Sequence, residues 1–401
     1  MGIDPNPTVS SICLISNYNL YESKRHFMLK FSEALKRKGV ETLMIDVGQQ
    51  KLDLETIKLI HYFKPVLTCS FNTILPFSDN HYLWDELKIP HWSILVDPVI
   101  YNMGLSQSPY AIVSCVDKGD CQHLSASTNS RVFFFPHAVE NSLNGIGDQQ
   151  KQYDVVFFGT CYDYEGLRES WQERHSPEIN KLLDEAIEIV LADTSTSIAE
   201  ALVKAWNRSS LSPSGIDFFN LFYYVDYYSR GKERVELIKA VKDVPVHVFG
   251  ETSEEMDVNR HGWDHYLGGC KNVKLHPSVP FTDSLEILKK SKIALNSMPF
   301  FKQGTHERVF TALGSGALPI TAGNIFWLDH FVNGEDIALY APAKWQQAGE
   351  LVHRYLADEN LRQEVVAKGA LKVQEEHTWD RRAEQALEML PPLLSMIDSK
   401  Q

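Results

Sequence analysis

The sequence predicts an α/β protein with two domains, each built around a parallel sheet. The chain has 401 residues, more than one hydrophobic core usually supports, and 44% of them are apolar. Short, continuously apolar segments alternate with helical patterns, as they do in parallel sheets with crossover helices. A polar, glycine-containing stretch at residues 141–152 separates two such series, and we interpret it as a linker.

The composition excludes several classes of protein. The net charge is −13, which argues against a long nucleic-acid groove. No apolar run reaches the ~18 to 20 residues that span a bilayer, and the start of the chain lacks a secretory layout, so we expect a cytoplasmic protein. The 6 cysteines form no C-x-x-C pair and are expected to be free thiols. Lys36–Lys38 could make a weak contact with an anionic membrane, although a solvated helix end explains the cluster as well.

The first domain is predicted at residues 9–140. It opens with a strand at Ser11–Ile15 and a helix at Arg25–Lys38 that stops before Gly39. Further strands are predicted at Thr42–Val47, Pro65–Ser70, Trp92–Val96, Ala111–Val116 and Arg131–Phe135. Ligands of open α/β sheets bind at the carboxyl ends of strands. The polar residues at those ends therefore mark a candidate site: Asn17-Tyr18-Asn19, Asn72, Asp97 and His137.

The second domain is predicted at residues 153–378. It begins with Tyr153–Thr160, a strand that runs into a glycine turn at Gly159, which is typical of a first βα junction. Residues 164–229 have a helical pattern and form an insertion that ends in the aromatic stretch Phe218–Tyr228, which we interpret as helix packing rather than a ligand box. The α/β pattern then resumes with a helix at Glu233–Val241, strands at Val246–Gly250, Val273–Leu275 and Ile293–Asn296, and a helix at Ser284–Lys290.

Gln303–Arg308 is the strongest local motif. It follows a strand and opens a helix that ends at Gly314-Ser315-Gly316. The backbone N–H groups and dipole of such a helix start suit a diphosphate, and Arg308 could add charge-assisted hydrogen bonds. The alternative is that Thr305 caps the helix while His306 and Arg308 are solvated on its first turn.

These residues also carry a family resemblance. Val273–Phe281 and His306–Thr321, within the stretch from Val273 to about Tyr340, resemble the donor-binding core of group-1 glycosyltransferases, including the CgeB-like branch with its helical insertion. Asp154–Gly159 resembles the first strand of that branch's second domain, and Phe135–Ala138 resembles the end of its first domain. The similarity extends over about residues 90–380.

The resemblance implies a GT-B fold, with two Rossmann-like parallel-sheet domains facing a central cleft and a helical insertion in the second. It implies metal-independent transfer of a sugar from a nucleotide-sugar donor, a UDP- or GDP-sugar first of all, to a hydroxyl acceptor such as a glycan, a lipid-linked glycan, a protein or a small molecule. No obligatory cofactor and no nucleic acid take part. The residues expected to bind the donor are Gly159, Arg230, Lys232, Gly250, Val279, Pro280, Phe281, Gly304, Thr305, His306, Glu307, Arg308 and Thr311.

Three residues are candidates for catalysis. A transfer with inversion needs a base for the acceptor proton. Asp97 is the preferred base and His137 the second choice, against a structural role in a turn for a polar residue at a strand end. His306 is expected to contact the transferred sugar or its phosphate. We find no Asp-x-Asp metal site, and Asp264-His265 and Asp329-His330 are interpreted as surface pairs.

The sequence departs from the family pattern at one position. Many members have a glutamate that binds the donor ribose where this chain has Thr311, which cannot offer a bidentate carboxylate. Glu307 lies one turn away and could substitute for it. The family usually has a pair of glutamates, and the position of the first falls near Gln303, so this chain also departs from the pattern of retaining enzymes. Two alternatives therefore stay open: an epimerase or hydrolase acting on sugar nucleotides, and a binding protein that has lost catalysis. The acceptor, the stereochemistry and the oligomeric state are also open.

A C-terminal helix and tail are predicted at residues 379–398. Apolar residues share one helical face from Trp379 to Leu390, and Pro391-Pro392 should end the helix. In this architecture the last helix packs toward the first domain.

Overall fold

The computed structural model describes residues 8–17, 19, 21–48, 53–72, 82–127, 131–143, 150–212, 215–255 and 260–398. The chain folds into two compact units. Unit 1 combines Met1–Ser142 with Pro280–Thr282 and Gln374–Gln401, and unit 2 combines Leu143–Val279 with Asp283–Val373. Tyr18, one of the predicted site residues, and residues 144–149 of the predicted linker lie outside the described residues.

Unit 1 is built on a six-stranded parallel sheet with the order β2-β1-β3-β4-β5-β6. Its strands are β1 (Ser11–Ser16), β2 (Glu41–Asp46), β3 (Leu67–Phe71), β4 (His91–Leu95), β5 (Ala111–Cys115) and β6 (Val132–Phe134). Every residue of β1, β3, β4 and β5 is buried. Continuous burial is expected when helices cover both faces of a parallel sheet, so the apolar runs did mark the strands.

The helices of unit 1 include the end of the chain. They are α1 (Ser23–Arg37), α2 (Leu54–Phe63), α3 (Leu83–Leu87), the 3-10 segment η1 (Val99–Gln107), α4 (Lys118–Ser127) and α15 (Trp379–Asp398). Trp379 packs against Phe31, with ring centroids 5.9 Å apart, and Phe31 packs in turn against Trp92 of β4 at 5.7 Å. The last helix thus supplies an aromatic side chain to the core of unit 1.

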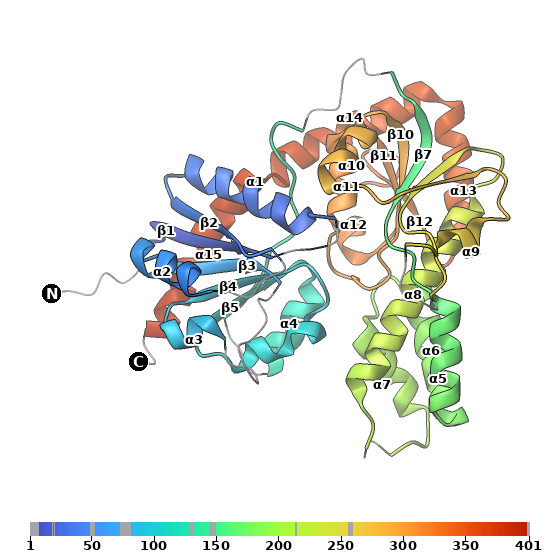
Figure 1. Cartoon of the computed structure of the whole chain (residues 1–401). Coiled ribbons are helices and arrows are strands. Elements are labelled where there is room, and N and C mark those ends of the chain that lie inside the picture. Colours follow the sequence, from blue (N-terminus) through green and yellow to red (C-terminus); the bar gives the residue numbers. More distant parts are fainter. Residues whose placement is uncertain are drawn as a thin grey trace. The chain divides into compact units, whose positions relative to one another are not determined.

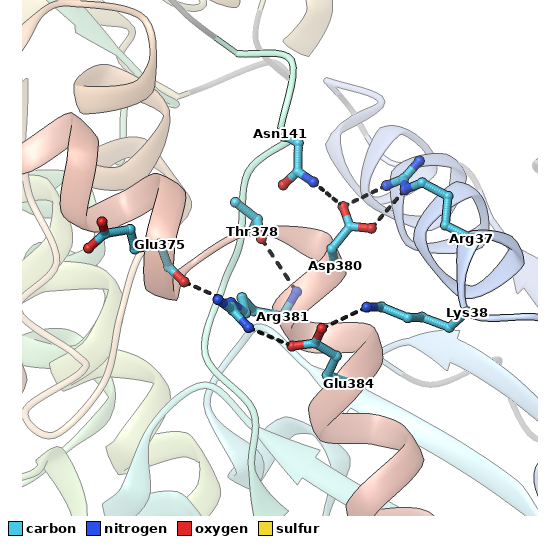
Figure 2. Close-up of polar contacts among 8 residues, drawn as sticks. All are labelled: Arg37, Lys38, Asn141, Glu375, Thr378, Asp380, Arg381 and Glu384. Atoms are coloured by element: carbon cyan, nitrogen blue, oxygen red, sulfur yellow. Dashed lines mark hydrogen bonds and ion pairs between the residues drawn. The ribbon is translucent and has the colours of Figure 1, made fainter.

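Polar contacts tie the start of α15 to the end of α1 (Figure 2). Asp380 accepts two hydrogen bonds from Arg37, at 2.7 and 2.8 Å, and a third from Asn141. Lys38 donates to Glu384 at 2.6 Å. Two of the three cations that suggested a membrane contact are therefore engaged in ion pairs within unit 1.

The predicted helix stop at Pro391-Pro392 is wrong, because α15 runs through both prolines to Asp398. A proline inside a helix removes a hydrogen bond and crowds the preceding turn. Burial of Leu393, Leu394 and Ile397 beyond the prolines offsets this cost, since each is at most 9% exposed.

Unit 2 is also built on a six-stranded parallel sheet, with the order β12-β11-β10-β7-β8-β9 (Figure 1). Its strands are β7 (Tyr153–Phe158), β8 (Val246–Phe249), β9 (Val273–His276), β10 (Ser291–Asn296), β11 (Leu318–Ala322) and β12 (Ala338–Tyr340). Helices α9 (Trp263–Leu267), α10 (Phe281–Lys289), α11 (Glu307–Gly314), α12 (Ile325–His330), α13 (Trp345–Ala357) and α14 (Glu359–Glu376) lie between and after the strands. The first residues of α10 and the last of α14 belong to unit 1.

Four helices between β7 and β8 form the insertion: α5 (Tyr164–Arg174), α6 (Pro177–Ala192), α7 (Ile198–Asn207) and α8 (Phe218–Ala240). They project from the rest of unit 2 as a bundle (Figure 1). Aromatic residues of α8 pack inside it, with the rings of Tyr224 and Tyr228 about 5.5 and 5.4 Å from Trp171. The prediction of helix packing is therefore confirmed.

The predicted separate helix at Glu233 is wrong, since α8 is one helix of 23 residues. Gly231 does not interrupt it. A Cβ atom at this position would lie 2.8 Å from the Tyr162 carbonyl oxygen and 2.8 Å from Tyr164 Cβ. The glycine therefore lets α8 approach the segment after β7.

Candidate functional site

The carboxyl ends of the unit 2 strands bring several predicted residues to one edge of the sheet. In parallel register, Phe158 of β7 pairs with Phe249 of β8, and Asn296 of β10 pairs with Thr321 of β11. Gly159, Gly250 and the loop after Asn296 therefore follow neighbouring strands at the same edge. This is where open α/β sheets bind ligands.

Gly159 and Gly250 are required by close packing. Gly159 has φ +156°, and a Cβ atom there would lie 3.3 Å from an Arg234 nitrogen. A Cβ atom on Gly250 would lie 2.4 Å from the Gly159 carbonyl oxygen, which also accepts a 3.0 Å hydrogen bond from Trp263. The two glycines thus allow the loops after β7 and β8 to come into contact.

His306 is the N-cap of α11. Thr305, which the alternative reading assigned as the cap, is fully buried, and His306 is only 9% exposed. Arg308 is half-buried, so the reading of His306 and Arg308 as solvated residues is wrong. The apolar face of α11 fixes its position, because Val309, Phe310 and Leu313 are fully buried.

The His306 side chain contacts the two residues that follow it. Its Nδ1 lies 2.6 Å from Glu307 Oε2 and 3.4 Å from the Arg308 amide nitrogen. Nδ1 accepts the Arg308 amide proton, which caps α11, and it also lies beside the Glu307 carboxylate. Burial lowers the pKa of His306, although Glu307 opposes the shift, while the charges of Arg308 and Arg234 add to it.

Thr311 uses its hydroxyl proton within the helix. The hydroxyl donates to the carbonyl oxygens of Glu307 and Arg308, at 3.0 and 3.2 Å. Only its lone pairs stay available to a ligand. Glu307, one turn earlier, is 15% exposed at its side chain and is held beside His306.

Asn324 holds the loop before α11 and was missed by the sequence analysis. Its Nδ2 donates to the carbonyl oxygens of Phe301 and Gly304, both at 3.0 Å, while its Oδ1 accepts from the Trp327 amide and caps α12. The predicted donor-binding residue Gly304 is thus fixed from the next βα turn. The position of Asn324, two residues after β11, was the available signal.

The predicted phosphate contacts Arg230 and Lys232 have other partners. Arg230 forms a fork with the fully buried carboxylate of Asp226, at 2.7 and 2.9 Å. Lys232 is half-buried, with its ammonium 5.9 Å from the centroid of the Tyr228 ring. The Arg230 guanidinium also lies 3.7 Å from the centroid of the Phe300 ring, which in turn is 6.3 Å from the His306 ring.

Arg234, one turn after Arg230 on α8, is a further cation at this edge, and the sequence analysis missed it. It is 3% exposed, it donates to the Thr160 carbonyl at 2.6 Å, and it lies over the Tyr162 ring. It also contacts the Gly159 turn and lowers the pKa of His306. Arg234 follows Arg230 by four residues and so shares its face of the helix, and this spacing was the sequence signal that could have identified it.

Phe281 is placed in unit 1 together with Pro280. Its ring packs against Phe27 and His26, at 5.1 and 5.0 Å between centroids, and its amide donates to the Tyr21 carbonyl. Val279 is half-buried and is the last residue of the preceding segment of unit 2. Of these three residues predicted to bind the donor, Val279 therefore belongs to unit 2, whereas Pro280 and Phe281 belong to unit 1.

The polar residues predicted for unit 1 form a connected group. Asn72 Nδ2 donates to Asp97 Oδ2 at 2.8 Å, and Asn72 Oδ1 accepts from the Val96 amide at 2.9 Å. Asn72 has a left-handed backbone, with φ 56°, in which asparagine is better tolerated than most residues. Burial lowers the pKa of Lys24, while the charge of Asp97 opposes that shift.

The other predicted residues of unit 1 are more dispersed. Asn19 Oδ1 accepts the Lys24 amide proton at 3.2 Å, which ties it to the start of α1, whereas Asn17 is half-buried. His137 is 5% exposed and lies edge-on to Phe27, at 6.4 Å between ring centroids. Asp97 and Asn72 thus form the more open polar pair.

Within the described part of the chain, no group of three or more His, Cys, Asp or Glu side chains is arranged to hold a metal. Asp264 accepts hydrogen bonds from the amide and hydroxyl of Ser253, so it has a local structural role. Across the same described residues, no helix is long and apolar enough to cross a membrane.

The comparisons with solved structures define the fold class. The chain is similar to a glycosyltransferase from Rickettsia africae (9% identity, TM-score 0.56, covering 96% of this chain and 98% of the other). It is also similar to sucrose-phosphate synthase from Thermosynechococcus elongatus (11%, 0.56, 96% and 99%) and to HepE of Anabaena in complex with UDP and glucose (10%, 0.53, 95% and 99%). The two six-stranded parallel sheets and these neighbours confirm the predicted two-domain GT-B α/β fold.

The comparison with protein families covers the second half of the chain. Residues 232–388 match the family described as glycosyl transferase-like. This match and the fold support the predicted resemblance to group-1 glycosyltransferases. No curated protein sequence matches the chain significantly.

Proposed function

We propose that this protein is a glycosyltransferase that moves a sugar from a nucleotide-sugar donor to a hydroxyl group of an acceptor, with the donor bound by unit 2. The observation that carries the proposal is the group formed by the start of α11, Arg308 and Arg234 beside the Gly159 turn. All of these residues except Gly159 lie in the segment that matches the glycosyl transferase-like family.

The donor diphosphate is proposed to lie at the start of α11. The first amides of a helix have no intrahelical partner, and its dipole is positive at this end, so a diphosphate is stabilised there. Arg308 and Arg234 add two cations. Arginine side chains meet the negative charge that develops on the leaving nucleoside diphosphate, so the reaction as proposed requires no metal ion.

His306, which lies beside Glu307, is proposed to contact the transferred sugar or its phosphate. Glu307 is proposed to bind the ribose in place of the missing glutamate at position 311.

Asp97 of unit 1 is proposed as the base that accepts the acceptor proton. The bond from the anomeric carbon to the phosphate oxygen breaks, a bond to the acceptor oxygen forms, and the hydroxyl proton passes to Asp97. Asn72 holds one carboxylate oxygen, which orients the other. This assignment applies to an inverting route.

UDP is the first nucleotide to test, because the similar protein HepE was solved in complex with UDP. Wild type, His306→Ala and Arg308→Ala are compared for the rise in melting temperature with UDP, GDP, TDP and CMP, free and as sugar nucleotides. A ligand that binds only the native state raises its stability by mass action. A selective rise that both substitutions weaken supports the proposal, whereas no rise with any nucleotide contradicts it.

Product analysis separates the alternatives. Transfer to an added acceptor supports a glycosyltransferase. Free sugar or an epimer would instead identify a hydrolase or an epimerase, and binding without turnover would identify a binding protein.

A further inference from the structure

The loop between β10 and α11 (residues 297–306) leads directly to His306 and is held from two directions within unit 2. On one side is the start of α12. Asn324 binds the Phe301 and Gly304 carbonyls, and the Ile325 amide donates to the Lys302 carbonyl at 2.9 Å. These contacts come from the βα unit that follows the loop, as expected of adjacent turns at one edge of a sheet.

The other side of the loop is bound to the insertion through Lys302. Its ammonium group donates to the carbonyl oxygens of Val190 and Asp193, at 2.6 and 2.8 Å, and the residue is 6% exposed. These carbonyls mark the carboxyl end of α6. The last carbonyls of a helix lack intrahelical donors and carry the negative end of the dipole, so a buried ammonium is stabilised there.

Helix α8 makes two further contacts with the same loop. Ser297 donates to Glu233 Oε2 at 2.7 Å. The guanidinium of Arg230 lies 3.7 Å from the centroid of the Phe300 ring, and its fork with Asp226 fixes it there. The Phe300 ring is 6.3 Å from the His306 ring, so the contact is adjacent to the proposed donor site.

We propose that the helical insertion α5–α8 is a coupling element that sets the position of the 297–306 loop and hence the affinity of unit 2 for its nucleotide. This inference rests on the proposed function. Because coupling between two sites is reciprocal, a nucleotide at His306 and Arg308 must also stabilise the end of α6.

The first test compares Lys302→Met with a matched control in the full-length protein. Methionine keeps most of the side-chain length but removes the ammonium. Lys204→Met is the control, because Lys204 donates only within the insertion, to Thr196 at 2.8 Å. We expect the dissociation constant for UDP to rise about 10-fold in Lys302→Met, and to be unchanged in Lys204→Met.

The second test does not depend on a variant that folds. In the wild type, hydrogen exchange is measured at the backbone amides of residues 190–196 with and without saturating UDP. We expect UDP to slow exchange there, and to do so less in Lys302→Met if that variant folds. A purely structural lysine would change the melting temperature without this response to the ligand.

Nucleotide binding by the wild type is measured first, because it separates a failure of the proposed function from a failure of the proposed coupling. If the wild type binds none of the tested nucleotides, the proposed function fails and the coupling fails with it. If the wild type binds UDP but exchange at residues 190–196 does not respond, the coupling alone is wrong. A folded Lys302→Met that binds UDP as tightly as the wild type also overturns it.

Discussion

Units 1 and 2 each contain a six-stranded parallel sheet, but the side chains at the carboxyl edges of the two sheets differ in charge. In unit 2, the edge carries the start of α11 with Arg308, and Arg234 beside the Gly159 turn. In unit 1, the corresponding edge carries a carboxylate, Asp97, held by the amide of Asn72. The cationic edge suits a diphosphate and the anionic edge suits a hydroxyl that must lose a proton, so similar scaffolds can divide the donor and acceptor roles.

The units also differ in how their edge loops are supported. Asn72 in unit 1 is held by the segment that directly follows the neighbouring strand β4, through Val96 and Asp97. The loop before α11 in unit 2 is held in part by two helices of the insertion, through the contact of Lys302 with the end of α6 and that of Arg230 of α8 with Phe300. This difference is the basis of the role proposed for the insertion on the donor side, and the predictions below test the proposed division of roles.

The largest effect is expected from Asp97→Asn. Removing a general base lowers kcat by about 1,000-fold, while UDP affinity, assigned to unit 2, stays unchanged. Steady-state kinetics with the acceptor, together with UDP titration, checks both. Asp46→Asn is the control, because Asp46 ends another strand at the same edge of unit 1 and pairs with Arg25. If Asp97→Asn keeps more than a tenth of the wild-type activity, Asp97 is not the general base.

Arg234→Met should affect UDP binding more than stability, and Arg230→Met should affect stability more than UDP binding, although both residues lie on α8. Loss of the Arg234 guanidinium is expected to weaken UDP binding by about 2 kcal/mol, the size of a hydrogen bond to a charged group. Arg230→Met leaves the buried carboxylate of Asp226 without its ion pair and is expected to cost about 3 kcal/mol of unfolding free energy. Calorimetric titration with UDP and urea unfolding measure the two quantities. If Arg230→Met weakens UDP binding more than Arg234→Met does, Arg230 is the phosphate contact.

Acid should destabilise unit 1 through His91. Burial lowers the pKa of His91 to about 3, and its ring nitrogens are engaged by Thr68 and Ser70. The folded pKa lies below the ordinary value near 6.5, so the contribution is fully present above pH 6.5 and is lost as the pH falls below it. This loss is about 2 kcal/mol at pH 5.

Urea unfolding at pH 7.5, 6 and 5 checks this expectation. His91→Asn should have a flatter pH dependence than the wild type, although it is less stable at neutral pH. Other buried histidines contribute to both proteins, so the difference isolates His91. Equal slopes for the two proteins would assign the acid sensitivity to another group.

The smallest effects are expected where α15 meets α1 in unit 1. Asp380 is 16% exposed and accepts a fork from Arg37, whereas Glu384 is 43% exposed and pairs with Lys38. Asp380→Asn should cost about 1 kcal/mol of unfolding free energy, and Glu384→Gln less than about 0.5 kcal/mol. Melting curves at low and high salt check the order. A larger loss in Glu384→Gln would show that the exposed pair contributes more than its exposure predicts.

Much of the fold followed from local patterns in the sequence. Continuous burial of β1, β3, β4 and β5 matches the predicted apolar runs, because helices cover both faces of a parallel sheet. The path of the last helix past Pro391 could not be predicted, since it depends on the burial of Leu394 and Ile397 by residues distant in the sequence.

The sequence by itself determined the two α/β series, the helical insertion between β7 and β8, and the start of a helix within Gln303–Arg308, since these patterns are local. Only the tertiary structure decided which arginine faces the Gly159 turn. Arg230 and Arg234 lie on the same helix, but Asp226 neutralises the first while the loop after β7 receives the second. The tertiary structure also joined Lys302 to the end of α6, more than a hundred residues earlier in the chain. A side chain's partner is set by which elements pack together, and sequence spacing does not specify this.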